Sequence, residues 1–320
     1  CLTIIPAFGM RPRIRIGVDP IYWLNALSFS FADVPTHALS EASFGGIWGG
    51  DQSPVTLLHA EGEFDVELGD QSFGLVLYAL FGTLSTDADS PVAGANTHNY
   101  TLANTNQHTS LSISTIDPIG QFIYELAMID TFELIVEPDA IVHYTANFMS
   151  KGSQDSGGQV SSFGAEQKFV GRHLTLSYAA TTGALPGTVV DAKSLTLRIE
   201  KNTEVNNILS TIQPEDVLNK RFHISGEFTL NYEDRAFLDF IKAGTTRALR
   251  IDLTHTNFIT GSTAYQFTID LSKVSFDVFD PDFSLDEIVT QTITFNALYD
   301  AGTNDNVVNS VTLINAVVSY

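Results

Sequence analysis

A regular alternation of polar and apolar positions is the clearest pattern along this chain. Residues 60–70, AEGEFDVELGD, carry an acidic residue at every second position from 61 to 67, with Gly, Phe and Val between them. Alternation with a period of two is typical of a β-strand, because successive side chains point to opposite faces of a sheet. The segment therefore predicts a strand with one core-facing side and one side that presents Glu61, Glu63, Asp65 and Glu67.

Segments rich in Thr, Val, Ile and Phe predict further strands and place the chain in the mainly β class. A short helix is expected after Asp70 and another after Asp234, because either carboxylate could serve as an N-cap. The predicted strands are 109–115, 132–137 and 141–148 in the first half, and 249–255, 265–271, 274–280 and 290–298 in the second.

The second half of the chain resembles the first. Residues 59–77 align without a gap with residues 223–241, at an offset of 164. Such self-similarity indicates a duplicated structural unit. Six positions of this window are identical: His59 with His223, Gly62 with Gly226, Glu63 with Glu227, Phe64 with Phe228, Asp70 with Asp234 and Phe73 with Phe237.

A second match sets residues 124–148 against 265–298, anchored on the triplets Glu-Pro-Asp at 137–139 and Asp-Pro-Asp at 280–282. Its offset is 143, so the first copy is expected to contain about 21 extra residues between the two matches.

We therefore predict two tandem, related β domains, each with one flanking helix. The first spans residues 1–180 and carries a longer polar loop around 83–112, and the second spans 181–320. The Gly- and Pro-containing segment 179–187 is the expected linker.

Charge is unevenly distributed along the sequence. The formal net charge is -21, and residues 16–150 contain 17 acidic residues but no Lys or Arg. Such a field repels polyanions and opposes static binding to nucleic acid or to an anionic membrane. No apolar run approaches the roughly 20 residues of a membrane-spanning helix, so we expect no membrane insertion by this chain.

Catalytic and metal-binding signatures are weak. The sequence has no G-x-S-x-G, P-loop or G-x-G-x-x-G motif, and its eight His form no H-x-x-x-H pair. We expect no cofactor, no metal and no enzyme activity. Two other readings stay open: a carbohydrate-active enzyme that uses paired carboxylates, and a secreted or lipid-anchored β-sandwich adhesin, suggested by Cys1 and the Thr- and Asn-rich loops.

The ordered series of segments resembles the major tail tube proteins of long, flexible-tailed (siphovirus-like) bacteriophages of the two-domain type. The resemblance covers about residues 20–320 and rests on segments such as GEFDVELGDQSFGLVLYALFG, DAKSLTLRIEKNTEVNN and LDEIVTQTITFNALYD. It implies tail-tube-type β-sandwich or half-barrel domains with long hairpins, whose rings stack into a tube that conducts the genome. The expected location is the phage tail of the virion, after assembly in the host cytoplasm.

The duplication adds detail to that resemblance. If each copy is one tube unit, three chains would form a ring with pseudo-sixfold symmetry. An acidic bore would let double-stranded DNA pass without sticking, and tail tip and tail terminator proteins would meet the tube ends. As the hypothetical lining we predict Glu61, Glu63, Asp65, Glu67, Glu227 and Glu233.

Contacts between rings or subunits are expected from two loops. The loop FGGIWGG at 44–50 offers an apolar anchor, and the polar segment 83–112 could reach a neighbour. The predicted contact residues are Trp48, His98, Tyr100, Asn104 and His108.

Overall fold

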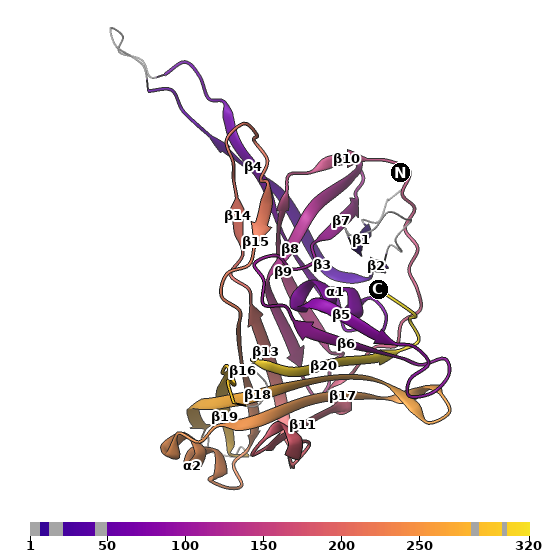
Figure 1. Ribbon diagram of the computed structural model, residues 1–320, viewed down its shortest axis with the longest axis vertical. Coiled ribbons are helices and arrows are strands. Elements are labelled where there is room, and N and C mark those ends of the chain that lie inside the picture. Colours follow the sequence, from indigo (N-terminus) through magenta and orange to yellow (C-terminus); the bar gives the residue numbers. More distant parts are fainter. Residues whose placement is uncertain (1–6, 13–21, 42–49, 283–287, 303–305) are drawn as a thin grey trace.

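The computed structural model describes residues 7–12, 22–41, 50–282, 288–302 and 306–320, and it is mainly β with two α-helices in those ranges (Figure 1). The mainly β prediction is confirmed. All strand pairings in the described ranges are antiparallel, so each strand can keep one face in a core and one face in solvent.

Eight strands follow one another in a first layer. Their side chains alternate between a buried face and a polar face, as the sequence pattern predicts. The pairing order is β3 (Ala26–His37), β4 (Val55–Glu67), β9 (His143–Lys151), β8 (Gln121–Val136), β13 (Ala192–Glu200), β16 (His223–Asn231), β19 (Thr290–Ala297) and the second half of β18 (Thr263–Asp282).

A second layer continues from the long, shared strand β18, and a smaller run continues from the first half of β8. The second layer contains β12 (Thr188–Val190), β11 (Leu174–Ala179), β17 (Arg247–Thr260), β18, β20 (Val308–Asn315), β6 (Asn96–Leu102) and β5 (Gly82–Asp87). The smaller run pairs β2 (Tyr22–Leu24), β1 (Ala7–Pro12), β7 (Leu111–Ile116), β8 and β10 (Gln154–Ser156).

Helix α1 (Phe73–Phe81) lies in the core between the layers, near the centre of the molecule in Figure 1. Its sequence, FGLVLYALF, has no charged residue, and all of it except Tyr78 is buried. The ring of Phe73 lies 5.2 Å from that of Tyr144 in the first layer and 5.1 Å from that of Phe267 in the second. The helix therefore joins the two layers by aromatic packing.

Helix α2 (Ala236–Ala243) instead lies at the surface, because Asp239 and Lys242 give it a polar side. Phe237, which matches Phe73 in the repeat, is the part of this helix that is buried, and its ring lies 5.3 Å from that of Phe228 in β16. The expectation of one flanking helix per copy therefore describes α2 better than α1.

The two expected N-caps differ. Asp234 accepts a hydrogen bond from the backbone N–H of Ala236 at the start of α2 (2.9 Å). Asp70 does not cap α1, since its Oδ1 accepts from the backbone N–H of Gln167 (2.6 Å) and the cap position falls on Ser72. Neither predicted residue occupies the cap position, which is Arg235 in α2, but the carboxylate of Asp234 still binds the first turn of its helix, whereas that of Asp70 binds another segment of the chain.

The strand pairings of the first half recur in the second half, and so do their β-bulges. The register of β3 on β4 shifts between Ala26 and Ser28, and that of β13 on β16 shifts between Ala192 and Ser194. A β-bulge adds one residue to one strand and changes its twist, so bulges at matched places indicate a shared architecture.

A second pair of matched bulges corrects the alignment. The register of β8 on β9 shifts around Asp130, and that of β18 on β19 shifts around Asp277, which is an offset of 147 and not 143. The triplets at 137–139 and 280–282 misled the alignment, because Pro138 follows β8 whereas Pro281 lies within β18. The excess in the first copy is therefore about 17 residues.

The segment 83–112 is not a long loop, contrary to prediction. Most of it forms the hairpin of β5 and β6 and the beginning of β7, and β6 pairs with β20. Two other hairpins project from the body in Figure 1: β3 with β4, and β14 (Glu204–Asn206) with β15 (Asp216–Leu218). They are linked where the backbone N–H of Leu58 donates to the carbonyl of Ile212 (2.6 Å).

Candidate acidic face and assembly edges

Strand β4 presents its acidic residues on the face of the first layer that is turned away from the core. Phe64 and Val66 are 0% and 1% exposed, so the alternate positions must point the other way. The Oδ1 atom of Asp65 lies 2.9 Å from Nδ1 of His143 on β9, which places both side chains on the same face. The alternation seen in the sequence thus sorts core residues from carboxylates.

Carboxylates lie on five of the eight strands of this face (β4, β8, β13, β16 and β18), and we call it the acidic face. Two basic residues, Lys151 and Arg198, occupy paired positions on it. Its acidic residues, by strand parity and register, are Glu61, Glu63, Asp65, Glu67, Glu133, Glu200, Glu227, Asp280 and Asp282.

Some of these carboxylates have partners and others face solvent. Arg198 donates to Glu133 at 2.9 Å, and the carboxylate of Glu61 lies 3.1 Å from the ring of His59. The side chains of Glu63 and Glu227 are exposed to solvent. The acidic face therefore keeps a net negative field in water.

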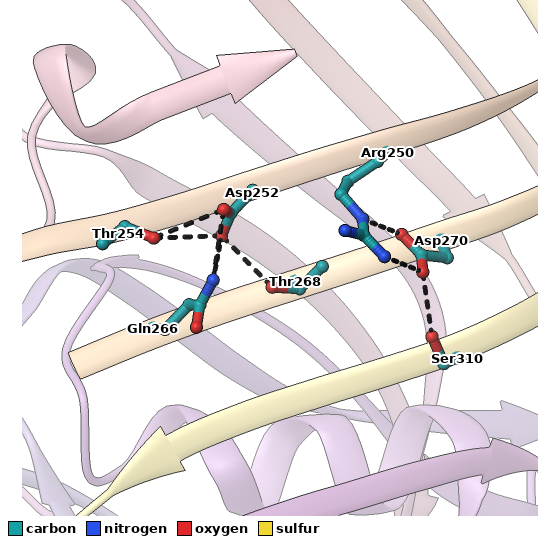
Figure 2. Close-up of polar contacts among 7 residues, drawn as sticks. All are labelled: Arg250, Asp252, Thr254, Gln266, Thr268, Asp270 and Ser310. Atoms are coloured by element: carbon teal, nitrogen blue, oxygen red, sulfur yellow. Dashed lines mark hydrogen bonds and ion pairs between the residues drawn. The ribbon is translucent and has the colours of Figure 1, made fainter. Parts of the chain in front are cut away.

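On the outward face of the second layer, the carboxylates of Asp270 and Asp252 accept hydrogen bonds from neighbouring side chains (Figure 2). Asp270, 3% exposed, accepts two hydrogen bonds from Arg250 (2.7 and 2.8 Å) and one from Ser310 (3.2 Å). The hydrogen bonds to Asp270 raise the pKa of the Arg250 guanidinium. This paired geometry is the strong, two-point form of a charge-assisted hydrogen bond.

The neighbouring carboxylate of Asp252 accepts hydrogen bonds from three uncharged side chains. Figure 2 shows Thr254, Gln266 and Thr268 converging on it, at distances from 2.9 to 3.3 Å. On this face the acids hold strands β17, β18 and β20 together. On the acidic face, by contrast, Glu63 and Glu227 are exposed and carry their charge into solvent.

The predicted lining residues are mostly brought together. Glu61, Glu63, Asp65 and Glu67 line up on β4, and Glu227 lies on the same face of β16. Glu233 does not join them. It is exposed in the segment between β16 and α2, beside a cavity of about 130 Å³ whose lining includes Tyr178 and Phe237.

The predicted contact residues are scattered. His98 and Tyr100, on β6, are 0% and 1% exposed. The Nε2 atom of His98 lies 3.0 Å from the side chain of Asn315, and burial lowers its pKa. Both side chains are buried in the core of this chain, where a neighbouring subunit cannot reach them.

Two of the remaining contact residues, Asn104 and His108, lie beside the same cavity. Asn104 is exposed, whereas His108 is half-buried and its Nε2 lies 2.9 Å from the carbonyl of Ala103. Both line a cavity of about 430 Å³ that also contains Lys201. Trp48 lies outside the described residues.

Sequence reasoning missed four members of the acidic face: Glu133, Glu200, Asp280 and Asp282. The signal for Glu133 and Glu200 was present, because each alternates with core residues in FELIVE and LTLRIE. What the sequence could not give was the pairing of β8 with β13, which brings residues about 65 positions apart side by side.

Comparison with known families decides what this β architecture belongs to. A family model described as phage tail tube protein matches residues 43–297, which is most of the chain. The chain belongs to the phage tail tube protein family. It is therefore a structural component of the virion tail, and membership of this family implies self-assembly into a tube.

The other comparisons add less. No match to a curated protein was found. Neither described helix has the length and apolar character needed to cross a membrane. Within the described ranges, no three His, Cys, Asp or Glu side chains are grouped so that they could hold a metal ion.

Proposed function

We propose that three chains of this phage tail tube protein form a ring with pseudo-sixfold symmetry, and that stacked rings conduct the DNA genome through a bore lined by the acidic face. The observation that carries the proposal is the first layer, in which β3, β4, β9 and β8 of one copy are followed by β13, β16, β19 and β18 of the other. Residues 1–180 and 181–320 would be the two ring units.

The dimensions of such a ring suit a DNA duplex. Three chains would contribute about 24 strands, spaced at about 4.8 Å and tilted by about 40°. A closed sheet of that size has a backbone diameter of about 50 Å. After side chains are allowed for, the bore is roughly 30 to 40 Å wide, which leaves a hydrated clearance around a duplex about 20 Å across.

Electrostatics favours passage over binding. Proteins that hold DNA neutralise its phosphates with Lys and Arg and gain free energy from released counterions. A wall with nine acids and two bases per chain at its paired positions does the reverse and keeps the duplex near the axis. The role is structural and needs no cofactor, and tail tip and terminator proteins would meet the two ends of the tube.

The test reverses two matched charges. Glu63 and Glu227 occupy equivalent places in the repeat, so six such carboxylates would ring the bore. In virions that carry Glu63→Lys and Glu227→Lys we expect tubes of normal length but genome ejection slowed at least tenfold, and less so at high salt, which screens the attraction.

A control variant carries the same charge change elsewhere. Asp155 and Asp239 are exposed and lie outside the acidic face, so Asp155→Lys with Asp239→Lys should leave ejection unchanged. Normal ejection by the Glu63 and Glu227 variant, with intact tubes, would reject the acidic lining. A purified parent protein that shows only dispersed small particles by negative-stain microscopy would reject tube formation.

A further inference from the structure

Among the described residues, the first layer ends at β3 on one side and at the second half of β18 on the other. Within the described residues, β3 pairs with β4 alone, and residues 275–282 of β18 pair with β19 alone. Exposed strand edges offer unpaired N–H and C=O groups and readily recruit another strand. One chain therefore carries two edges of the same sheet, at opposite ends.

Apolar side chains at both edges are incompletely covered. Phe31 on β3 and Phe279 on β18 are only half-buried. At the junction between the copies inside the chain, the corresponding residues Leu197 and Phe132 are 1% and 2% exposed. Covering the edges with another strand would bury this apolar surface, at a gain of about 25 cal/mol per Å².

The pairing of the two copies inside one chain indicates how another strand would pair with each edge. There, β8 pairs with β13, and Glu133 stands opposite Arg198. Ala32 takes the place of Arg198 at the open edge of β3, because Ala32 stands opposite Glu61 just as Arg198 stands opposite Ser225, and residues 61 and 225 are equivalent.

Asp280 takes the place of Glu133 at the other edge. Glu133 stands opposite Thr145 on β9, and Asp280 stands opposite Thr292 on β19. Both Thr residues lie at the offset of 147 that the matched bulges define.

We propose that β18 of one chain pairs antiparallel with β3 of a second copy, with Asp280 opposite Ala32 and Asp282 opposite Ser30. This seam between subunits rests on the proposed function, and it specifies the partner and register of the ring contact. It differs from the internal junction in one respect: Ala32 provides no cation where Arg198 pairs with Glu133. Ala32→Arg is therefore expected to strengthen the ring contact, and this gain should vanish with Asp280→Ala.

Engineered cysteines test the register. Cys1 is the chain's single Cys, so a Cys1→Ser background is free of other thiols. Residues directly opposite each other in antiparallel strands have Cα atoms about 4.5 to 5.5 Å apart, which suits a disulfide. In assembled tubes, Ala32→Cys with Asp280→Cys should oxidise to covalent chains that end at three subunits.

Two further pairs calibrate the result. Glu133→Cys with Arg198→Cys should form a disulfide within one chain. Thr36→Cys with Asp280→Cys is displaced by four residues along β3, so it should not crosslink. If tubes form but the Ala32 pair stays reduced, or the Thr36 pair crosslinks instead, the proposed register is wrong, although the proposal of a tube is still supported. A background protein that never polymerises contradicts the proposed function, and the seam with it.

Discussion

Arg198 donates a hydrogen bond to Glu133 at 2.9 Å across the pairing of β13 with β8, which joins the first layer of one copy to that of the other. The two side chains are 51% and 30% exposed, so solvent screens their attraction. The residues beside them on these strands, Leu197 and Leu134, are 1% and 0% exposed. Apolar packing therefore holds the two copies together, and the ion pair favours the observed register of the two strands.

The unequal contributions of apolar packing and of the ion pair predict the effects of two substitutions on β13. Arg198→Ala should lower the free energy of unfolding by less than about 1 kcal/mol, as for other exposed ion pairs. Leu197→Ala should lower it by about 2 to 5 kcal/mol, because it leaves a cavity in the core. Urea denaturation of the two variants measures both values, and equal losses would contradict the account.

Matched glycines in the two copies give a second prediction. A Cβ on Gly226 would meet the ring of Phe295 at 2.5 Å and the carbonyl of Thr196 at 2.5 Å. A Cβ on Gly62 would meet the ring of Phe31 at 2.4 Å, but that ring lies on an edge strand and is only half-buried.

Gly226→Ala should therefore destabilise the protein by about 1 to 3 kcal/mol, and Gly62→Ala by less, because a half-buried ring can turn aside whereas a backbone carbonyl cannot. Thermal unfolding of the two variants compares them directly. A larger loss for Gly62→Ala would show that Phe31 is held more firmly than its exposure indicates.

Asp70 gives a prediction about pH. Burial raises the pKa of its carboxyl to about 6, and within the described residues Oδ2 has no hydrogen-bond partner. The folded state then binds more protons than the unfolded state between pH 4 and 6. The contribution of Asp70 to the free energy of unfolding should accordingly fall as pH rises through that window.

Asp70→Asn removes the charge and keeps an oxygen for the backbone N–H of Gln167. At pH 7 it should stabilise the protein by about 2 kcal/mol, and it should flatten the dependence of stability on pH between 4 and 6. Asp70→Ala, which also loses the acceptor, should recover about 1 kcal/mol less. Parallel pH profiles for the wild-type protein and Asp70→Asn would contradict the assignment.

Local patterns in the sequence were sufficient for much of the fold. The alternation around Phe64 fixed both the core face and the acidic face of β4, and the match of Phe73 with Phe237 located the aromatic residue that anchors each helix. The burial of α1 follows from its lack of charged residues. These features depend on neighbours in sequence, so their signal is local.

Features that depend on distant segments were not predictable. His98 looks like a surface residue within NTHNYT, yet Asn315 and the carbonyl of Val317 approach its ring from the far end of the chain. Asp70 likewise does not cap α1, because its carboxylate accepts a hydrogen bond from the backbone N–H of Gln167, which is distant in sequence. Pairing across such separations comes from the packing of layers, which a single sequence does not encode in any short motif.

The most direct test of the account is a cryo-electron microscopy reconstruction of tubes assembled from the purified chain. The account predicts rings of three subunits, about 24 strands around the bore, and the carboxylates of Glu63 and Glu227 pointing toward the axis. Rings whose acidic face lies on the outside of the tube, or whose bore is lined by Arg250 and its neighbours on the second layer, would contradict it.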